Sequence, residues 1–87
     1  MNLEHDMVTD SKYAEGVAYP VRMKILSLLL EKGSMYQAEI VKQLRGTEFE
    51  KEFRTIQTHL KKMESCDLIE ITKDKKGLTV VIPKKRV

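Results

Sequence analysis

The sequence predicts a mainly α-helical domain that ends in a β-hairpin. Between residues 20 and 65, apolar residues recur at steps of three and four, which is the spacing of amphipathic helices. After Cys66 the spacing changes to alternation, in two β-branched runs on either side of a short turn that contains glycine. With 87 residues, of which 41% are hydrophobic, the chain has room for a single modest core and therefore for one domain.

That domain is expected over residues 11–83, between two tails. Residues 1–10 are acidic and are expected to form a loose tail, while residues 84–87, "KKRV", form a basic tail. No apolar run reaches the roughly 18 residues of a membrane span, and the acidic start does not resemble a secretory signal. A single cysteine cannot form an internal disulfide, which favours a reducing, cytoplasmic setting.

The first half of the domain predicts two helices. Asp10 or Ser11 could cap a short one through "KYAEGVAY", which Gly16 weakens. Pro20 suits the first turn of the next, "VRMKILSLLLEKG", because its missing N–H is not needed there. The apolar stripe of this helix is broad, which predicts packing on more than one side, and Gly33 closes its end.

Two more helices and the hairpin follow. Ser34 is the expected cap of a helix over "MYQAEIVKQL". Thr47 with Glu50 three residues later is a capping-box pattern, so the fourth helix is predicted over residues 47–65. Its apolar residues follow at steps of four, three, four and three: Phe49, Phe53, Ile56, Leu60 and Met63. The strands "LIEIT" and "LTVVIP" then flank the turn "KDKKG".

Three helices followed by a hairpin is the order of a winged helix-turn-helix domain, and three stretches resemble known families. "AYPVRMKILSLLLEKG" looks like the second-helix signature of the arsenic-repressor (ArsR) family. "RTIQTHLKKMESCDLIEI" is similar to that family's recognition helix and its exit into the wing, whereas "GSMYQAEIVKQL" is similar to a helix of the phenolic-acid-regulator (PadR) family. The resemblance covers roughly Tyr13 to Pro83 and implies a DNA-binding transcriptional regulator.

The sequence departs from the family pattern in two places. Metal-sensing members of the arsenic-repressor family use paired cysteines or His/Asp/Glu sets, which this chain lacks. The segment "RGTEFEKE" is also longer than the usual tight turn, which leaves the start of the recognition helix open.

Helical phasing tests the recognition-helix prediction without reference to any family. At about 100° per residue, Arg54, Thr58 and Lys61 fall within about 40° of the point opposite Ile56. Arg and Lys can bond guanine, Gln can bond adenine, and Thr can contact a thymine methyl, while lysines further along suit phosphates. The predicted DNA contacts of this helix are Arg54, Thr55, Gln57, Thr58, Lys61 and Lys62.

The charge distribution agrees with a polyanionic partner, although the same charges also have explanations that involve no partner. Residues 51–87 hold ten Lys/Arg against five Asp/Glu, whereas residues 1–18 have a net charge of −3. The hairpin tip carries Lys73, Lys75 and Lys76, which suit phosphate or minor-groove contact. Lysines there also protect strand edges from pairing, and a charged helix face can simply be solvated.

Three glutamates near the start of the fourth helix do not favour DNA. Phasing places Glu48 and Glu52 toward the core side, and their carboxylates interact favourably with the N-terminus of the helix. Glu50 would lie close to a bound duplex, and its role stays open. These residues favour the alternative reading, a winged-helix protein-interaction module without base readout.

The remaining residues give no sign of catalysis. His59 lies at the edge of the apolar stripe and is expected to be a satisfied boundary histidine. Cys66 lies about 10 Å further along, too far for a catalytic pair, and is expected to be packed. No enzyme, metal, cofactor or small-molecule ligand is expected. The expected partners are double-stranded DNA and a second copy, with this predicted dimer surface: Tyr13, Val17, Tyr19, Met23 and Leu30.

Overall fold

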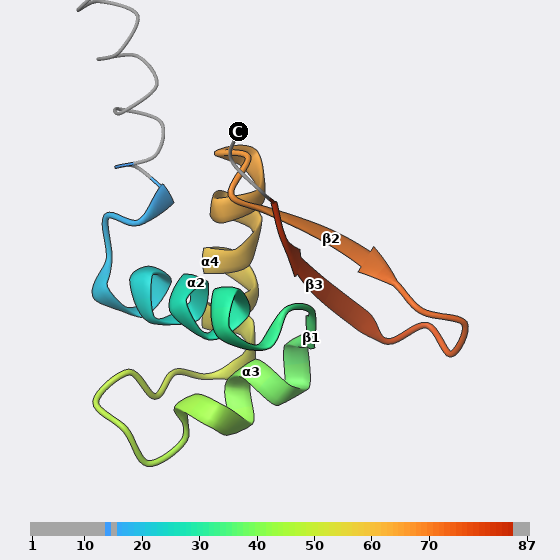
Figure 1. The fold of residues 1–87 in the computed structure, drawn as a ribbon. Helices are drawn as coiled ribbons and strands as arrows, with labels where there is room; N and C mark the ends of the chain where they lie inside the picture. The colour runs from blue at the N-terminus through green and yellow to red at the C-terminus, as the bar shows by residue number, and fades with distance from the viewer. Residues whose placement is uncertain (1–13, 15, 85–87) are drawn as a thin grey trace, which may run out of the picture.

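The computed structural model describes residues 14 and 16–84, which form three helices and a three-stranded antiparallel sheet (Figure 1). In chain order the elements are α2 (Pro20–Lys32), β1 (Met35–Tyr36), α3 (Gln37–Leu44), α4 (Phe53–Ser65), β2 (Ile69–Lys73) and β3 (Thr79–Pro83). The predicted C-terminal hairpin is present, and the sheet has one strand more than the sequence predicted. Tyr13 and residues 1–10, with their predicted tail, lie outside the described residues.

Helix α2 has the bounds that its terminal residues predict. Pro20 is its first residue, and Gly33 ends it in the left-handed region with φ +83°. The Gly33 N–H donates to the Leu29 carbonyl oxygen over 2.7 Å, which satisfies one of the carbonyls at the helix end. The centre of the predicted stripe is buried, with Ile25 and Leu29 fully inaccessible to solvent, whereas Met23 and Leu30 at its margins are exposed.

Residues 35 and 36 are a strand, which corrects the prediction that Ser34 caps a helix there. Met35 pairs with Val81 and Tyr36 pairs with Val80, so that β1 adds to the free edge of β3. Pairing buries the Met35 side chain, whereas Tyr36 is exposed and does not join the apolar face of α3 as predicted. Helix α3 begins at Gln37 without a side-chain cap.

The sheet has the order β1-β3-β2, with β3 in the centre. Val81 of β3 pairs with Met35 at one edge and with Ile71 at the other. The hairpin projects from the helices, with its turn at the far end (Figure 1). Val81 is completely buried because strands cover both edges of β3 at this residue and the helices cover one face.

Helix α4 begins at Phe53, so the predicted start at Thr47 is wrong. The Thr47 hydroxyl donates to the Leu44 carbonyl oxygen over 2.6 Å and accepts the Phe49 N–H over 3.1 Å. The Glu50 N–H donates to the Thr47 carbonyl oxygen over 3.1 Å. The same residue types that make a capping box therefore close a turn here, because the chain after Gly46, at φ +80°, has left the helical path.

The core joins all three helices to the inner side of the sheet. From α4 it takes Ile56, Leu60 and Met63, which are at most 1% exposed. Phe49 is only half-buried and Phe53 is 50% exposed, so the buried part of the predicted apolar stripe begins at Ile56, two steps later than expected. With this stripe held in the core, the opposite side of α4 faces solvent.

Candidate nucleic-acid interface

The solvent-facing side of α4 carries the polar side chains that phasing placed there. Exposed side chains along it are Arg54, Thr55, Gln57, Thr58 and Lys61, while Lys62 is half-buried. The Thr58 hydroxyl donates to the Arg54 carbonyl oxygen over 3.1 Å, so its oxygen stays available as an acceptor. This face therefore offers guanidinium, ammonium, amide and hydroxyl groups to a partner.

The hairpin tip is a hydrogen-bonded turn organised by Asp74, which sequence reasoning missed. One carboxylate oxygen accepts the N–H groups of Lys76 and Leu78 over 2.8 and 3.0 Å. The Gly77 N–H donates to the Asp74 carbonyl oxygen over 3.0 Å, with Gly77 at φ +82°. Asp followed by Gly three residues later is a known turn signature, so the signal was present in the sequence.

Asp74 also ties the hairpin tip to the start of α3. Its second carboxylate oxygen accepts the Tyr36 hydroxyl over 2.8 Å. This hydrogen bond, together with the N–H groups of the turn, holds the pKa of Asp74 below its usual value. The same bond and the negative charge of Asp74 raise the pKa of Tyr36. The predicted contacts Lys73, Lys75 and Lys76 are exposed on either side of this anchored residue.

A hollow lies between the hairpin and the start of α4. It is lined from three elements: by Phe53 of α4, by the first turn of α3 with Tyr36 before it, and by the segment 77–79 that follows the lysines of the tip. Three large side chains on its walls, Tyr36, Phe53 and Leu78, are 43%, 50% and 52% exposed. The start of α4 and the segment that follows the basic tip thus lie on opposite walls of one hollow.

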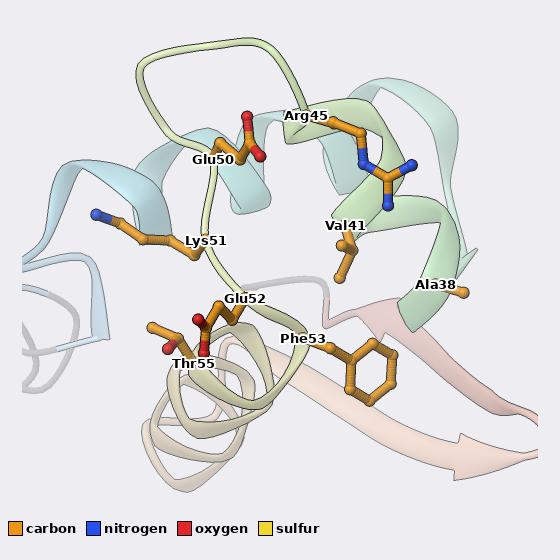
Figure 2. A pocket seen from close by; sticks show the side chains of 8 residues that line it. All are labelled: Ala38, Val41, Arg45, Glu50, Lys51, Glu52, Phe53 and Thr55. Carbon is orange, nitrogen blue, oxygen red and sulfur yellow. The ribbon is translucent and has the colours of Figure 1, made fainter.

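A second hollow lies between α3 and the start of α4 (Figure 2). It is lined by Ala38, Val41, Arg45, Glu50, Lys51, Glu52, Phe53 and Thr55. Figure 2 shows the Phe53 ring directed toward the α3 side of this hollow, while Lys51 extends in the opposite direction. Phe53 is thus common to both hollows.

The three glutamates lie before α4 rather than on it, which corrects their predicted phasing. All three are exposed, and Glu52 is the N-cap residue without a side-chain cap hydrogen bond. The Glu50 carboxylate accepts the Gly46 N–H over 2.8 Å. Glu50 therefore has a structural role, since it closes the loop that connects α3 to α4.

His59 joins α4 to α2 at the edge of the core. Arg22, only 8% exposed, donates its Nε–H to His59 Nδ1 over 2.9 Å. The Tyr19 ring lies 4.4 Å from Arg22 Cζ and 5.4 Å from the His59 ring. Burial, followed by the charges of Arg22 and Lys51, lowers the pKa of His59. His59 is a hydrogen-bonded boundary residue, and Cys66 is buried, as the sequence predicted.

The residues of the predicted dimer surface differ in their exposure. Tyr19, Met23 and Leu30 are 54%, 56% and 67% exposed. Val17 is half-buried against the core, and its place in a dimer surface stays a prediction. Tyr13 lies outside the described residues.

Neither a metal-binding cluster nor a helix long and apolar enough to span a membrane is found within residues 14 and 16–84. Comparison of the chain with protein-family models, with curated proteins and with solved structures found no match.

Proposed function

We propose that this chain is a sequence-specific double-stranded-DNA-binding protein that regulates transcription. In this proposal α4 enters the major groove and the β2–β3 hairpin contacts the backbone as a wing. The observation that carries it is the hollow shared by Phe53, the first residue of α4, and residues 77–79 of the hairpin. Because of it, the polar side of α4 and the lysines of the tip can contact neighbouring parts of one duplex.

The topology supports a winged helix-turn-helix domain, while the resemblance to the arsenic-repressor family rests on the sequence. The order of elements is helix, short strand, two helices and hairpin. The short strand β1 lies beside β3, the last strand of the hairpin. The connection between α3 and α4, residues 45–52, is longer than the usual three- to four-residue turn. The internal hydrogen bond from Gly46 to Glu50 gives this longer connection a defined shape.

The side chains of α4 and those of the hairpin tip suit different parts of a duplex. Arg54, Gln57 and Thr58 offer the donor and acceptor pattern that base edges recognise, and Arg54 lies in the first turn of α4, where such helices contact bases. The lysines of the tip carry charge but little geometric specificity, which suits phosphates. Asp74, in the turn that carries them, is anchored by its hydrogen bond with Tyr36.

A homodimer on a roughly palindromic site is part of this proposal. The exposed apolar side chains Tyr19, Met23 and Leu30 on α2 and just before it supply a surface for a second copy. Two recognition helices would then contact half-sites about 10 base pairs apart. A DNA partner places the protein inside the cell, which agrees with the single cysteine.

The rival function is a protein-interaction module that does not read bases. The exposed side chains of Tyr36, Phe53 and Leu78 and the glutamates before α4 favour it. The two functions differ in one measurable respect. A DNA-binding protein releases counterions from the duplex, so its affinity falls linearly with salt on a double logarithmic scale.

The test is a salt titration of binding to random duplexes and to duplexes selected from genomic DNA. We expect Arg54→Ala to cost about 1–3 kcal/mol on the selected site and to remove selectivity. Lys75→Ala should weaken all duplexes alike and lower the salt slope by about one. Lys24→Ala, on α2 and away from the hollow, is the matched control and should change neither. Absence of duplex binding at low salt would refute the proposal.

A further inference from the structure

Phe53 is an aromatic residue that the core does not account for. It stands in the same apolar series as Ile56, Leu60 and Met63, yet it is 50% exposed while they are at most 1% exposed. It is also the first residue of α4, next to Arg54. A half-exposed ring at this position leaves apolar surface in water at the end of the helix that the proposed function places against bases.

The surroundings of Phe53 form a receptive site. The ring borders both hollows, one lined by Ala38 and Val41 and the other by Tyr36 and Leu78. Figure 2 shows the ring lying free of the α4 backbone and turned toward the first turn of α3. The linings include both cations and anions, so their charge does not select an occupant. The occupant is instead selected by the position of Phe53 at the start of α4 and by the apolar character of its ring.

The major groove presents one apolar group, the 5-methyl group of thymine. On the proposed function, which this inference extends, the N-terminal residues of α4 contact base edges. We propose that Phe53 is a specificity-determining residue that packs against the 5-methyl group of a thymine. The contact buries apolar surface from both partners and requires no hydrogen bond.

Gln57 strengthens the same base preference. It lies four residues after Phe53, so the two side chains are neighbours on one flank of α4, with Cβ atoms about 5–6 Å apart. Gln57 is exposed, and an amide can bond the N6 and N7 positions of adenine bidentately. An A·T pair displays both groups, a thymine methyl and the adenine edge. This flank of α4 is therefore suited to A·T pairs, whereas Arg54 suits guanine.

The decisive experiment removes single methyl groups from the DNA. Each thymine of a selected duplex is replaced in turn by deoxyuridine, which keeps every hydrogen-bonding group and lacks only the 5-methyl. At one position in each half-site we expect a loss of affinity of about three- to fivefold for the wild-type protein, the effect of about one buried methyl group. Phe53→Ala should bind the thymine and uracil duplexes equally, whereas Phe53→Leu should keep part of the difference.

A control separates direct contact from general damage. Leu78→Ala removes another apolar side chain of the same hollow from the hairpin side. This variant can bind every duplex more weakly, but its ratio of affinities for the thymine and uracil duplexes should equal that of the wild-type protein. Circular dichroism and urea unfolding verify that each variant is folded. If Phe53→Ala weakens both duplexes but keeps the thymine preference, Phe53 does not read the methyl group and the inference is wrong.

Failure of the inference and failure of the proposed function give different results. Selective, salt-dependent binding without any Phe53-dependent thymine position refutes the inference alone. Absence of binding to every duplex refutes the proposed function, and the inference with it.

Discussion

Lowering the pH should destabilise the fold through His59. Its Nδ1 accepts a hydrogen bond from the Arg22 Nε–H over 2.9 Å, so the imidazole must be neutral at this atom. Burial opposes the charged imidazolium, and protonation would also replace the acceptor by a second cation against Arg22. Since the unfolded chain has a histidine pKa near 6.5 and the folded protein a lower one, the unfolded chain binds the proton more readily.

The sign and the limit of the effect follow from this difference. The contribution of neutral His59 to the free energy of unfolding is fully present above pH 6.5. It is lost as the pH falls through 6.5 toward the pKa of His59 in the folded protein. Between about pH 7.5 and about pH 5.5 the loss has a limit of about 1.4 kcal/mol, reached when the folded protein stays unprotonated. His59 is partly exposed and takes up some protons when folded, so the measured loss should be smaller. The limit corresponds to a fall in Tm of roughly 6–11 °C.

Urea unfolding followed by circular dichroism across this pH range measures the loss, and the wild-type protein is compared with His59→Gln. The glutamine carbonyl can accept from Arg22 but does not titrate, so the variant should lose less stability between the two pH values. The difference between the two proteins isolates His59 from His5 and from the carboxylates. Equal pH dependence of both proteins, or a folded pKa of His59 at or above 6.5 by NMR, would refute the reasoning.

Three further predictions concern the core and the hairpin. Gly16→Ala should lower the free energy of unfolding by about 1–3 kcal/mol in urea, because the new Cβ would overlap Leu68 Cδ1; an unchanged midpoint would contradict this. Leu60→Ala should cost about 2–5 kcal/mol, since the side chain is 1% exposed, and a loss below 1 kcal/mol would show that the site collapses around the deletion. Asp74→Ala should bring the pKa of Tyr36 down toward 10.0, measured by tyrosinate absorbance against Tyr36→Phe; a Tyr36 pKa that stays raised would disprove the contact.

The features that could be predicted from the sequence depend on residues close together along the chain. Pro20 and Gly33 set the ends of α2, because each acts on its own backbone torsion and on hydrogen bonds within one turn. The apolar steps of α4 from Ile56 onward and the alternation in the hairpin are equally local. The exposure of Arg54 and Gln57 then follows from phase alone.

The features that could not be predicted depend on distant partners or on a choice between two local structures. The hydrogen bonds from Arg22 to His59 and from Tyr36 to Asp74 join residues 37 and 38 positions apart, and no spacing rule relates them. Thr47 and Glu50 satisfy both a capping box and a turn, and only the direction of the chain after Gly46 decides between them.

The central place of β3 also sets a limit on folding during synthesis. Both strands that pair with it, and all three helices that the structure describes, precede it in the chain. A nascent chain that has not yet released residues 79–83 from the ribosome can form helices, but it lacks Val81 in the core and the strand that joins β1 to β2. The folded domain therefore forms only after β3 has emerged, and until then a chaperone or a neighbouring chain has access to its unpaired strands.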